Sequence, residues 1–355
     1  MLQNRLLLAR HRPLRRLSTG QRRFRRRPIK VPSIARLNDI PTALITGVCG
    51  FCARHLVRML SGEGRVRIVG ADLLAAPPAD LELADYRAAD LARSDEAAAL
   101  IRQVRPDMVF HLAGRYRGTS DELYGANLLA GVHLLEAVRE SSPQARVLVV
   151  GTAAEYGPAP PEKMPIAEDH LCRPSGAYGL SKHALSLAAL DYARHRGLKV
   201  VVARPFNIIG AGVPPSLVVG AVLDRAKRAL AESEAPVVTV GNVDASRDFL
   251  AVEDVASAYL RMIRGEYWGE VFNICSGTAY RIRDVVESLL SHSLRPIEYR
   301  VDPNLLKPDD VAVFVGSCEK ARRTFGFVPT VAVEESLNSA WQHVMGPMKS
   351  CESCS

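Results

Sequence analysis

A tyrosine and a lysine four residues apart, Tyr178 and Lys182, stand at the start of a strongly helical stretch. On an α-helix this spacing places both side chains on one face, one turn apart. A phenol is a poor proton donor or acceptor near neutral pH because its ordinary pKa is about 10. A nearby ammonium lowers that pKa by stabilising the phenolate. The pair therefore predicts proton transfer at a catalytic site.

Thr152 follows an apolar run, residues 147–150, that we interpret as a buried strand. In a doubly wound sheet the binding crevice forms at the carboxyl ends of the strands. We therefore expect the Thr152 hydroxyl to emerge in that crevice.

A glycine-rich turn, residues 47–53 (GVCGFCA), joins a predicted strand at 43–46 to a predicted helix at 54–60. The first glycine permits a tight turn, and the second lets the backbone approach a pyrophosphate at the helix N-terminus. Ala53 is small enough for the helix to pack on the strand. Strand before and helix after is the context that this motif requires, so the turn predicts a dinucleotide cofactor.

Asp72 stands at the end of the second predicted strand, residues 66–71. A carboxylate there accepts hydrogen bonds from both hydroxyls of the adenosine ribose and repels a 2′-phosphate. This favours NAD(H) and leaves NADP(H) as the alternative, while a helix cap or turn aspartate is the other interpretation of Asp72. Asp90 and Leu91, which follow a loop, are weaker candidates for contact with the adenine.

Short apolar runs alternate with longer helical stretches between Pro41 and Lys182. This alternation predicts an α/β Rossmann fold, a doubly wound parallel sheet covered on both faces. After Arg204 the strands are shorter and more widely spaced, which predicts a smaller C-terminal α/β region that binds substrate. The predicted strands are residues 43–46, 66–71, 108–112, 147–150, 199–203, 237–240, 271–274 and 297–301, and the crossover helices include 94–104 and 123–139. The predicted division is a basic extension (1–40), a dinucleotide-binding domain (41–205), a substrate-binding region (206–345) and a tail (346–355).

The net charge of +8 is unevenly distributed. Residues 1–38 carry eleven arginines, Lys30 and no acidic residue, so the remaining chain has a charge of 8 − 12 = −4. A mildly acidic body argues against a nucleic-acid partner. The basic segment fits a mitochondrial transit peptide, but a disordered basic arm or a start codon assigned too early is the interpretation we favour, with a cytoplasmic protein as the expectation. No apolar run approaches the ~18 residues of a membrane-spanning helix.

Seven cysteines are scattered along the chain, which favours free thiols in a reducing compartment. Two pairs have CxxC spacing, Cys49–Cys52 and Cys351–Cys354. Structural zinc needs four ligands, and Cys49 lies inside the glycine turn, so no metal site is expected.

With these motifs in this order, the chain resembles the extended short-chain dehydrogenase/reductases that modify nucleotide-linked sugars. The resemblance covers about residues 41–343. It implies that Tyr178 donates or accepts a proton, that Lys182 activates it and binds the nicotinamide ribose, and that Thr152 polarises the sugar oxygen. The matching motifs are Thr46-Gly-x-x-Gly-Phe-x-Ala-x-x-Leu56, His111-Leu-Ala-Gly114, Thr152, Tyr178-x-x-x-Lys182 and Arg204-Pro-Phe-Asn207. The expected cofactor contacts are Gly47, Cys49, Gly50, Phe51, Cys52, Asp72, Asp90, Leu91, Leu112, Ala113, Gly114, Tyr178, Lys182 and Pro205, and the expected substrate contacts are Thr152, Ala153, Asn207, Arg247, Lys307 and Asp310.

The residues after Thr152 bear on the reaction. Dehydratases of this family carry an acidic residue two positions after the threonine, whereas this chain has Ala154 there and Ala153 before it. Glu155 could substitute only from the wrong side of the strand, because successive strand residues point to opposite faces. The sequence therefore disfavours dehydration.

The second half resembles the GDP-6-deoxy-D-mannose reductases in residues 151–157, 165–178, 241–252, 271–280 and 301–316. The resemblance implies that Arg247 neutralises a diphosphate, that Asn207 lies near the substrate phosphates, and that Asp310 binds the nucleotide ribose. A surface ion pair or helix cap is the other interpretation of Arg247 and Asp310. Lys307 replaces an arginine of the relatives and cannot form its bidentate fork, and Gly316-Ser317 replaces Gly-Asp.

The expected reaction is reduction of the C4 ketone of GDP-4-keto-6-deoxy-D-mannose to GDP-D-rhamnose, with a GDP-hexose as the preferred substrate. A nucleotide-sugar 4-epimerase with retained NAD is the first alternative, and a non-catalytic dinucleotide-binding regulator is the second. The family resemblance also implies a homodimer through the helices after Leu123 and Tyr178.

Overall fold

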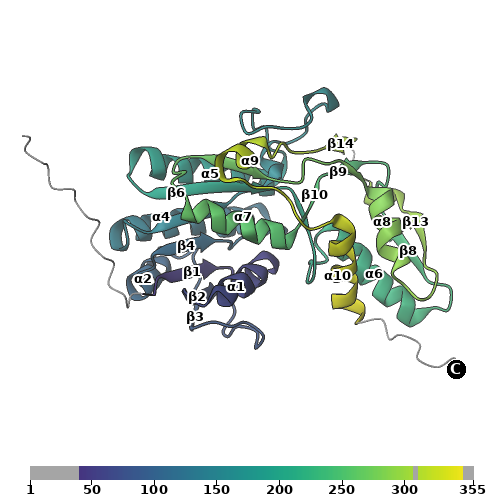
Figure 1. Ribbon diagram of the computed structural model, residues 1–355, viewed down its shortest axis with the longest axis horizontal. Helices are drawn as coiled ribbons and strands as arrows, with labels where there is room; N and C mark the ends of the chain where they lie inside the picture. Colours follow the sequence, from purple (N-terminus) through teal and green to yellow (C-terminus); the bar gives the residue numbers. More distant parts are fainter. Residues whose placement is uncertain (1–39, 307–310, 347–355) are drawn as a thin grey trace, which may run out of the picture. The chain divides into compact units, whose positions relative to one another are not determined.

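The computed structural model describes residues 40–306 and 311–346 (Figure 1). The predictions for the basic segment, Lys307, Asp310, Cys351, Cys354 and the tail therefore lie outside the described residues.

Seven parallel strands form the central sheet, which confirms the predicted doubly wound fold. The strand order reverses between β1 and β4, and in such sheets the ligand crevice lies at that switch point. Leu44 of β1, for example, lies between Val69 of β2 and Val109 of β4. In spatial order the strands are β3 (Asp85–Ala88), β2 (Arg67–Asp72), β1 (Thr42–Thr46), β4 (Met108–His111), β5 (Arg146–Val150), β6 (Lys199–Pro205) and β11 (Val271–Ile274).

Helices cover both faces of the sheet, because alternate strand residues point to opposite sides. Ala43 and Ile45 face one apolar cluster, whereas Leu44 faces the other. The first cluster packs under α1 (Phe51–Glu63), α7 (Val252–Arg264) and α9 (Glu319–Phe325). The second packs under α2 (Ser94–Val104), α4 (Ala130–Ser141) and α5 (Gly176–His195).

The helix predicted at 123–139 begins earlier and is not regular. It starts as α3 (Ser120–Tyr124), where Thr119 and Glu122 form a capping box, passes through the π-helical turn η1 (Gly125–Leu129), and continues as α4. Turns of this kind often occur at functional sites. Here the turn carries Asn127, a fully buried amide.

A second region packs around its own apolar core. The strands β8 (Val237–Val240) and β13 (Glu298–Val301) pair in parallel, beside α6 (Val218–Glu232), α8 (Ile282–Ser291) and α10 (Val333–Met345) (Figure 1). The later elements α7, β11 and α9 return to the central sheet, because their apolar residues belong to its core. The predicted boundary at residues 205 and 206 remains a prediction.

Short strands connect the two regions: β7 (Asn207–Ile209) with β10 (Phe249–Ala251), and β9 (Ser246–Arg247) with β12 (Tyr280–Arg281) and β14 (Val313–Phe314). Short helical turns occur at η2 (Ala153–Glu155), η3 (Pro161–Lys163) and η4 (Pro303–Leu305).

Two expectations about the whole chain can be compared with its described part. None of the described helices is long and apolar enough to cross a membrane. The cysteines at positions 49, 52, 172, 275 and 318 are free thiols, as predicted for them.

Candidate active site

The glycine turn has the geometry that the motif predicts. Gly47 has φ +67°, and an ideal Cβ there would lie 2.7 Å from both the backbone nitrogen and the Cα of Ala113. Gly50 precedes the first residue of α1, Phe51. A glycine is therefore required where the turn packs against the segment after β4, and the turn ends at the N-terminus of α1, a position that suits a pyrophosphate.

Asp72 is bonded to this turn. Its Oδ2 accepts a hydrogen bond of 3.0 Å from the backbone N–H of Cys49, and its Oδ1 accepts one of 2.8 Å from the N–H of Leu73. Burial and the neighbouring Asp72 carboxylate raise the pKa of the Cys49 thiol, so that thiol stays protonated. Asp72 thus acts as a turn aspartate and also lies at the strand end where a ribose is expected.

Asp90 and Leu91 are occupied within the fold. The Asp90 carboxylate accepts from the N–H of Ala92 at 3.0 Å, and the Leu91 side chain is buried in the core beneath α2 and α4. If Leu91 contacts a cofactor, it does so through its backbone. The cofactor contacts of Asp90 and Leu91 both remain predictions.

A cavity of about 430 Å³ lies at the carboxyl ends of β1, β4, β5 and β6. Most of the predicted site residues line it: Gly47, Gly50, Phe51, Cys52, Leu112, Gly114, Thr152, Ala153, Tyr178, Lys182, Pro205, Asn207 and Arg247. Cys49, Asp72, Asp90, Leu91 and Ala113 do not line it. A second hollow, at the amino ends of the strands, is lined by none of the predicted residues.

The strand does not continue through residues 153–155, so the expectation that strand alternation decides where Glu155 points is wrong. Residues 153–155 form η2, because Thr152 Oγ1 accepts from the N–H of Ala154 at 3.3 Å while Glu155 Oε1 accepts from the N–H of Thr152 at 2.9 Å. Glu155 is fully buried and does not line the cavity. Its Oε2 accepts from Arg204 Nε at 2.9 Å. The ion pair with Arg204, rather than strand alternation, keeps the Glu155 carboxylate out of the cavity, where it could otherwise act as an acid or base.

The pKa of Tyr178 differs from the expectation that Lys182 lowers it. Burial raises the pKa of the Tyr178 phenol to about 12, and the largest opposing effect comes from the Thr152 hydroxyl. The ring of Tyr116 packs edge-on against Tyr178, with the centroids 4.9 Å apart. The desolvation of the phenolate outweighs its stabilisation, so Tyr178 is a neutral phenol throughout the physiological range.

Lys182 is 5% exposed, and burial lowers its pKa to about 8. Within the described residues its Nζ has no hydrogen-bond or ion-pair partner, and an ideal Cβ on Gly114 would lie 3.6 Å from it. A buried ammonium that faces a cavity without a partner suits the hydroxyl groups of a ribose. The turn and this lysine together fit a nicotinamide dinucleotide.

Asn207 on β7 and Arg247 on β9 also line the cavity. Arg247 Nη1 donates to the carbonyls of Ser246 and Val311, both at 2.8 Å, and Asn207 Nδ2 donates to the carbonyl of Asp248 at 2.8 Å. The buried Asp248 carboxylate accepts from Ser276, Gly277 and Gly316, although burial raises its pKa to about 6. These bonds hold the Arg247 segment in place.

Several lining residues were missed by the sequence interpretation, notably Arg115, Tyr116, Asn127 and Phe314. Asn127 Oδ1 accepts from the N–H of Arg115 at 2.7 Å, and its Nδ2 donates to Ser181 Oγ at 3.0 Å. Ser181 Oγ in turn donates to the carbonyl of Tyr178 at 2.9 Å. A lone amide in an otherwise apolar helical run was the available signal for Asn127.

Comparison with known proteins agrees with the family resemblance that the sequence motifs indicate. The model of the NAD dependent epimerase/dehydratase family matches residues 43–275. The chain is 31% identical to the GDP-6-deoxy-D-mannose reductase of Pseudomonas aeruginosa over 301 residues, which are 83% of this chain and 94% of that protein.

Solved structures confirm the fold. RMD from Pseudomonas aeruginosa, complexed with NADPH, superposes with a TM-score of 0.73 at 28% identity, over 85% of this chain and 98% of that one. The UDP-glucose 4-epimerase of Thermus thermophilus, in complex with NAD, superposes with a TM-score of 0.73 at 25% identity, over 86% and 99% of the two chains.

Substitution of Gly47 by alanine tests the turn, and Gly64 provides a matched control. Both glycines have positive φ, +67° and +63°, but an ideal Cβ on Gly64 meets nothing within 4 Å. Gly64→Ala should lower the free energy of unfolding by about 1–2 kcal/mol through backbone strain alone. Gly47→Ala should cost about 1–3 kcal/mol more, because its Cβ overlaps the Ala113 backbone, and should weaken NADH binding at least tenfold. Urea unfolding without cofactor and fluorescence titration with NADH measure the two effects, and equal losses in the two variants would contradict this account.

Proposed function

The chain belongs to the NAD dependent epimerase/dehydratase family, and on that premise we propose that it reduces the C4 ketone of GDP-4-keto-6-deoxy-D-mannose to GDP-D-rhamnose. It is an enzyme that uses a nicotinamide dinucleotide. The proposal for the substrate draws on the Pseudomonas aeruginosa relative and on the resemblance of residues 151–157 and 241–252 to its subgroup.

One observation about the cavity carries the choice of reaction. None of the described residues that line it has a carboxylate, and Ala153 and Ala154 lie beside Thr152. Elimination of water needs an acid or base in addition to the tyrosine, whereas ketone reduction needs one proton donor. Lys182 and Arg247 bring positive charge to the cavity, which suits a substrate with a diphosphate, whereas the third cation, Arg115, is paired with Glu122.

The proposed mechanism assigns one task to each side chain. When bound, the nicotinamide dinucleotide supplies the hydride for C4. Tyr178, held as a neutral phenol by its raised pKa, donates the proton to the developing alkoxide. Thr152 stabilises that oxygen through its hydroxyl, and Lys182 binds the ribose of the cofactor.

A nucleotide-sugar 4-epimerase is the second candidate. The similarity to the Thermus thermophilus UDP-glucose 4-epimerase favours it, and epimerisation would use the same threonine, tyrosine and lysine. An epimerase must also take a proton from the sugar hydroxyl, a step that the reductase does not require.

An absorbance assay separates the two candidates. With NADH or NADPH and GDP-4-keto-6-deoxy-D-mannose, a reductase should oxidise one cofactor per sugar. Tyr178→Phe should lower kcat by about 10²–10⁴-fold and leave cofactor affinity nearly unchanged. Tyr267→Phe is the control, since Tyr267 donates to the Thr324 carbonyl outside the cavity. If the protein instead interconverts UDP- or GDP-hexoses without oxidising the cofactor, the reductase proposal is wrong and the protein is an epimerase.

We further propose that NAD(H) is the preferred cofactor, because of the Asp72 carboxylate. Asp72→Asn should keep an acceptor for the N–H of Cys49 but remove the charge that repels a 2′-phosphate. The ratio of NADH to NADPH affinity should therefore fall by about tenfold or more, which corresponds to ~1.4 kcal/mol. Fluorescence titrations of the two cofactors measure this ratio, and an unchanged ratio would assign the preference to other residues.

We also propose a homodimer through η1 and α5. Leu129 on η1 and Leu180 and Leu187 on α5 are 46%, 44% and 55% exposed, and seven residues separate the last two, which places them on one helix face. Leu180→Glu combined with Leu187→Glu should give a monomer in light scattering, because charges at an apolar interface are desolvated. Leu294→Glu, at a leucine 79% exposed outside these helices, should leave the mass unchanged. A monomeric parent protein would refute the dimer.

A further inference from the structure

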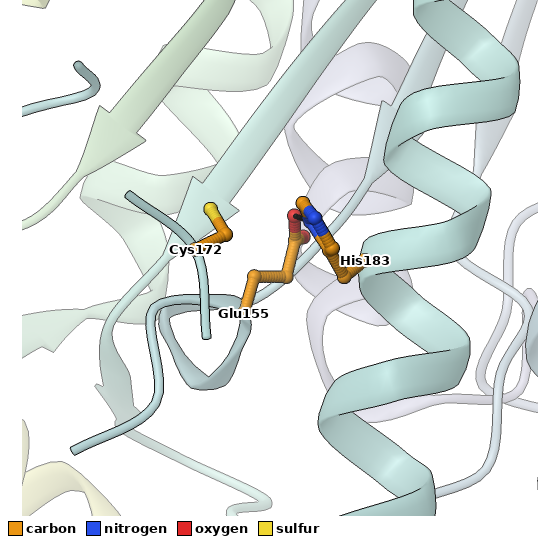
Figure 2. A group of neighbouring side chains, drawn as sticks. All are labelled: Glu155, Cys172 and His183. Carbon is orange, nitrogen blue, oxygen red and sulfur yellow. Dashed lines mark hydrogen bonds and ion pairs between the residues drawn. The ribbon is translucent and has the colours of Figure 1, made fainter. Parts of the chain in front are cut away.

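Three potential metal ligands, Glu155, Cys172 and His183, lie together in the structure (Figure 2). One ligand atom from each lies within 4.8 Å of the others. The Glu155 carboxylate reaches toward His183 on α5, but its Oε2 also accepts a hydrogen bond of 2.9 Å from Arg204 Nε. A buried carboxylate that is paired with a guanidinium has its charge compensated without a metal ion. The group is therefore better described as part of the ion pair that holds η2 than as a metal site.

A second tyrosine faces the active-site cavity and has no role in the proposed mechanism. Tyr116, in the loop that follows β4, lines the cavity together with Tyr178 and is 42% exposed. The two rings meet edge to face, with the centroids 4.9 Å apart and an interplanar angle of 73°. Rings attract one another in this arrangement, because the positive edge of one meets the negative face of the other. Tyr116 therefore packs directly against the proton donor.

The loop that carries Tyr116, residues 112–119, is anchored on both sides of the ring. On one side the Asn127 amide pairs with both backbone groups of Arg115. Its Oδ1 accepts from the N–H at 2.7 Å, and its Nδ2 donates to the carbonyl at 2.9 Å. On the other side Glu122 Oε2 accepts from the N–H of Thr119 at 2.8 Å. A loop held at both ends in this way presents the Tyr116 ring in a defined position.

The Asn127 amide also connects this loop to the backbone of Tyr178. Its Nδ2 donates to Ser181 Oγ at 3.0 Å, and Ser181 Oγ donates to the carbonyl of Tyr178 at 2.9 Å. One fully buried amide thus links the two segments that carry the tyrosines, and the contact between the rings joins their side chains.

Contact with a neighbouring ring restricts the movement of the Tyr178 side chain. The phenol oxygen lies on the axis of the Cβ–Cγ bond, so rotation about χ2 leaves it in place and rotation about χ1 shifts it. The staggered χ1 positions lie about 120° apart, so a change of rotamer would carry the oxygen away from the substrate. A ring packed against the phenol opposes such a change. This matters for the rate, because a displacement of about 1 Å at a reacting group can cost ~10²-fold.

We propose that Tyr116 is a positioning residue, whose ring holds the phenol of Tyr178 in the orientation that proton transfer requires. This rests on the role of Tyr178 in the proposed function. The contact is made between the rings, so the role belongs to the ring of Tyr116 and not to its hydroxyl.

Steady-state kinetics of two variants test the proposal. Tyr116→Ala should lower kcat by about tenfold or more, because the phenol of Tyr178 is then free to change rotamer. Tyr116→Phe keeps the ring and should retain kcat within about twofold. Because Tyr116 is 42% exposed, neither variant should change the melting temperature by more than about 4 °C or the NADH affinity by more than about threefold. A kcat in Tyr116→Ala equal to that of the parent protein would overturn the proposal.

A double-mutant cycle with Tyr178→Phe shows whether Tyr116 acts through the phenol. In that background Tyr116→Ala should lower kcat by about twofold or less, since no phenol hydroxyl remains to be oriented. A purely structural role, or a direct effect on the sugar, would give the same loss in both backgrounds and would overturn the proposal.

Arg117→Ala is the matched control, because Arg117 lies in the same loop, is exposed and does not line the cavity. Its kcat should stay within about twofold of the parent value. The cycle is measured with the sugar that the parent protein converts, either the GDP-4-keto sugar or a UDP- or GDP-hexose. Failure to reduce the GDP-sugar alone therefore refutes the proposed substrate, and the hexose assay then decides this inference. A parent protein that converts none of these sugars would overturn both.

Discussion

Parallel pairing of β1, β4, β5 and β6 is the constraint on which the site depends, because it brings four strand ends to one edge of the sheet. The glycine turn follows β1, Gly114 follows β4, Thr152 follows β5 and Pro205 ends β6. These residues are far apart in the chain, and no local structure could bring them together. Apolar layers on both faces hold the strands in this register. The packing of the core therefore also sets the geometry of the cavity.

Buried polar side chains then define the edge of the sheet in detail. Glu155 and Arg204 tie η2 to β6, Asn127 ties the loop after β4 to α5, and Asp248 ties the Arg247 segment to residues 276–277 and 316. Removing one partner of a buried ion pair typically costs about 3–5 kcal/mol, since the other charge is left uncompensated. Such groups therefore fix loop positions more strictly than apolar contacts, which tolerate small shifts.

The electrostatics of the cavity follow from burial. The same loss of water that raises the pKa of Tyr178 to about 12 lowers that of Lys182 to about 8. Both shifts favour the neutral forms, but a pKa of about 8 still leaves Lys182 mostly protonated near neutral pH, whereas Tyr178 stays a neutral phenol that can donate a proton. Lys182 and Arg247 line the cavity and none of its described lining residues has a carboxylate, which suits an anionic substrate and a single proton transfer.

The sequence by itself determined the fold class, the glycine turn and the order of the Thr152, Tyr178 and Lys182 motifs, because periodicity, spacing and local turn chemistry are properties of short segments. Only the tertiary structure decided that the Glu155 carboxylate is buried against Arg204, that Asn127 sits in a π-helical turn, and that burial outweighs Lys182 in setting the pKa of Tyr178. Each of these depends on partners distant in the chain: Glu155 on Arg204 and Ser186, Asn127 on Arg115 and Ser181, and Tyr178 on its enclosure by Tyr116 and Thr152. Desolvation is set by everything packed around a group, so spacing along the chain predicts which residues meet but not the protonation that their surroundings impose.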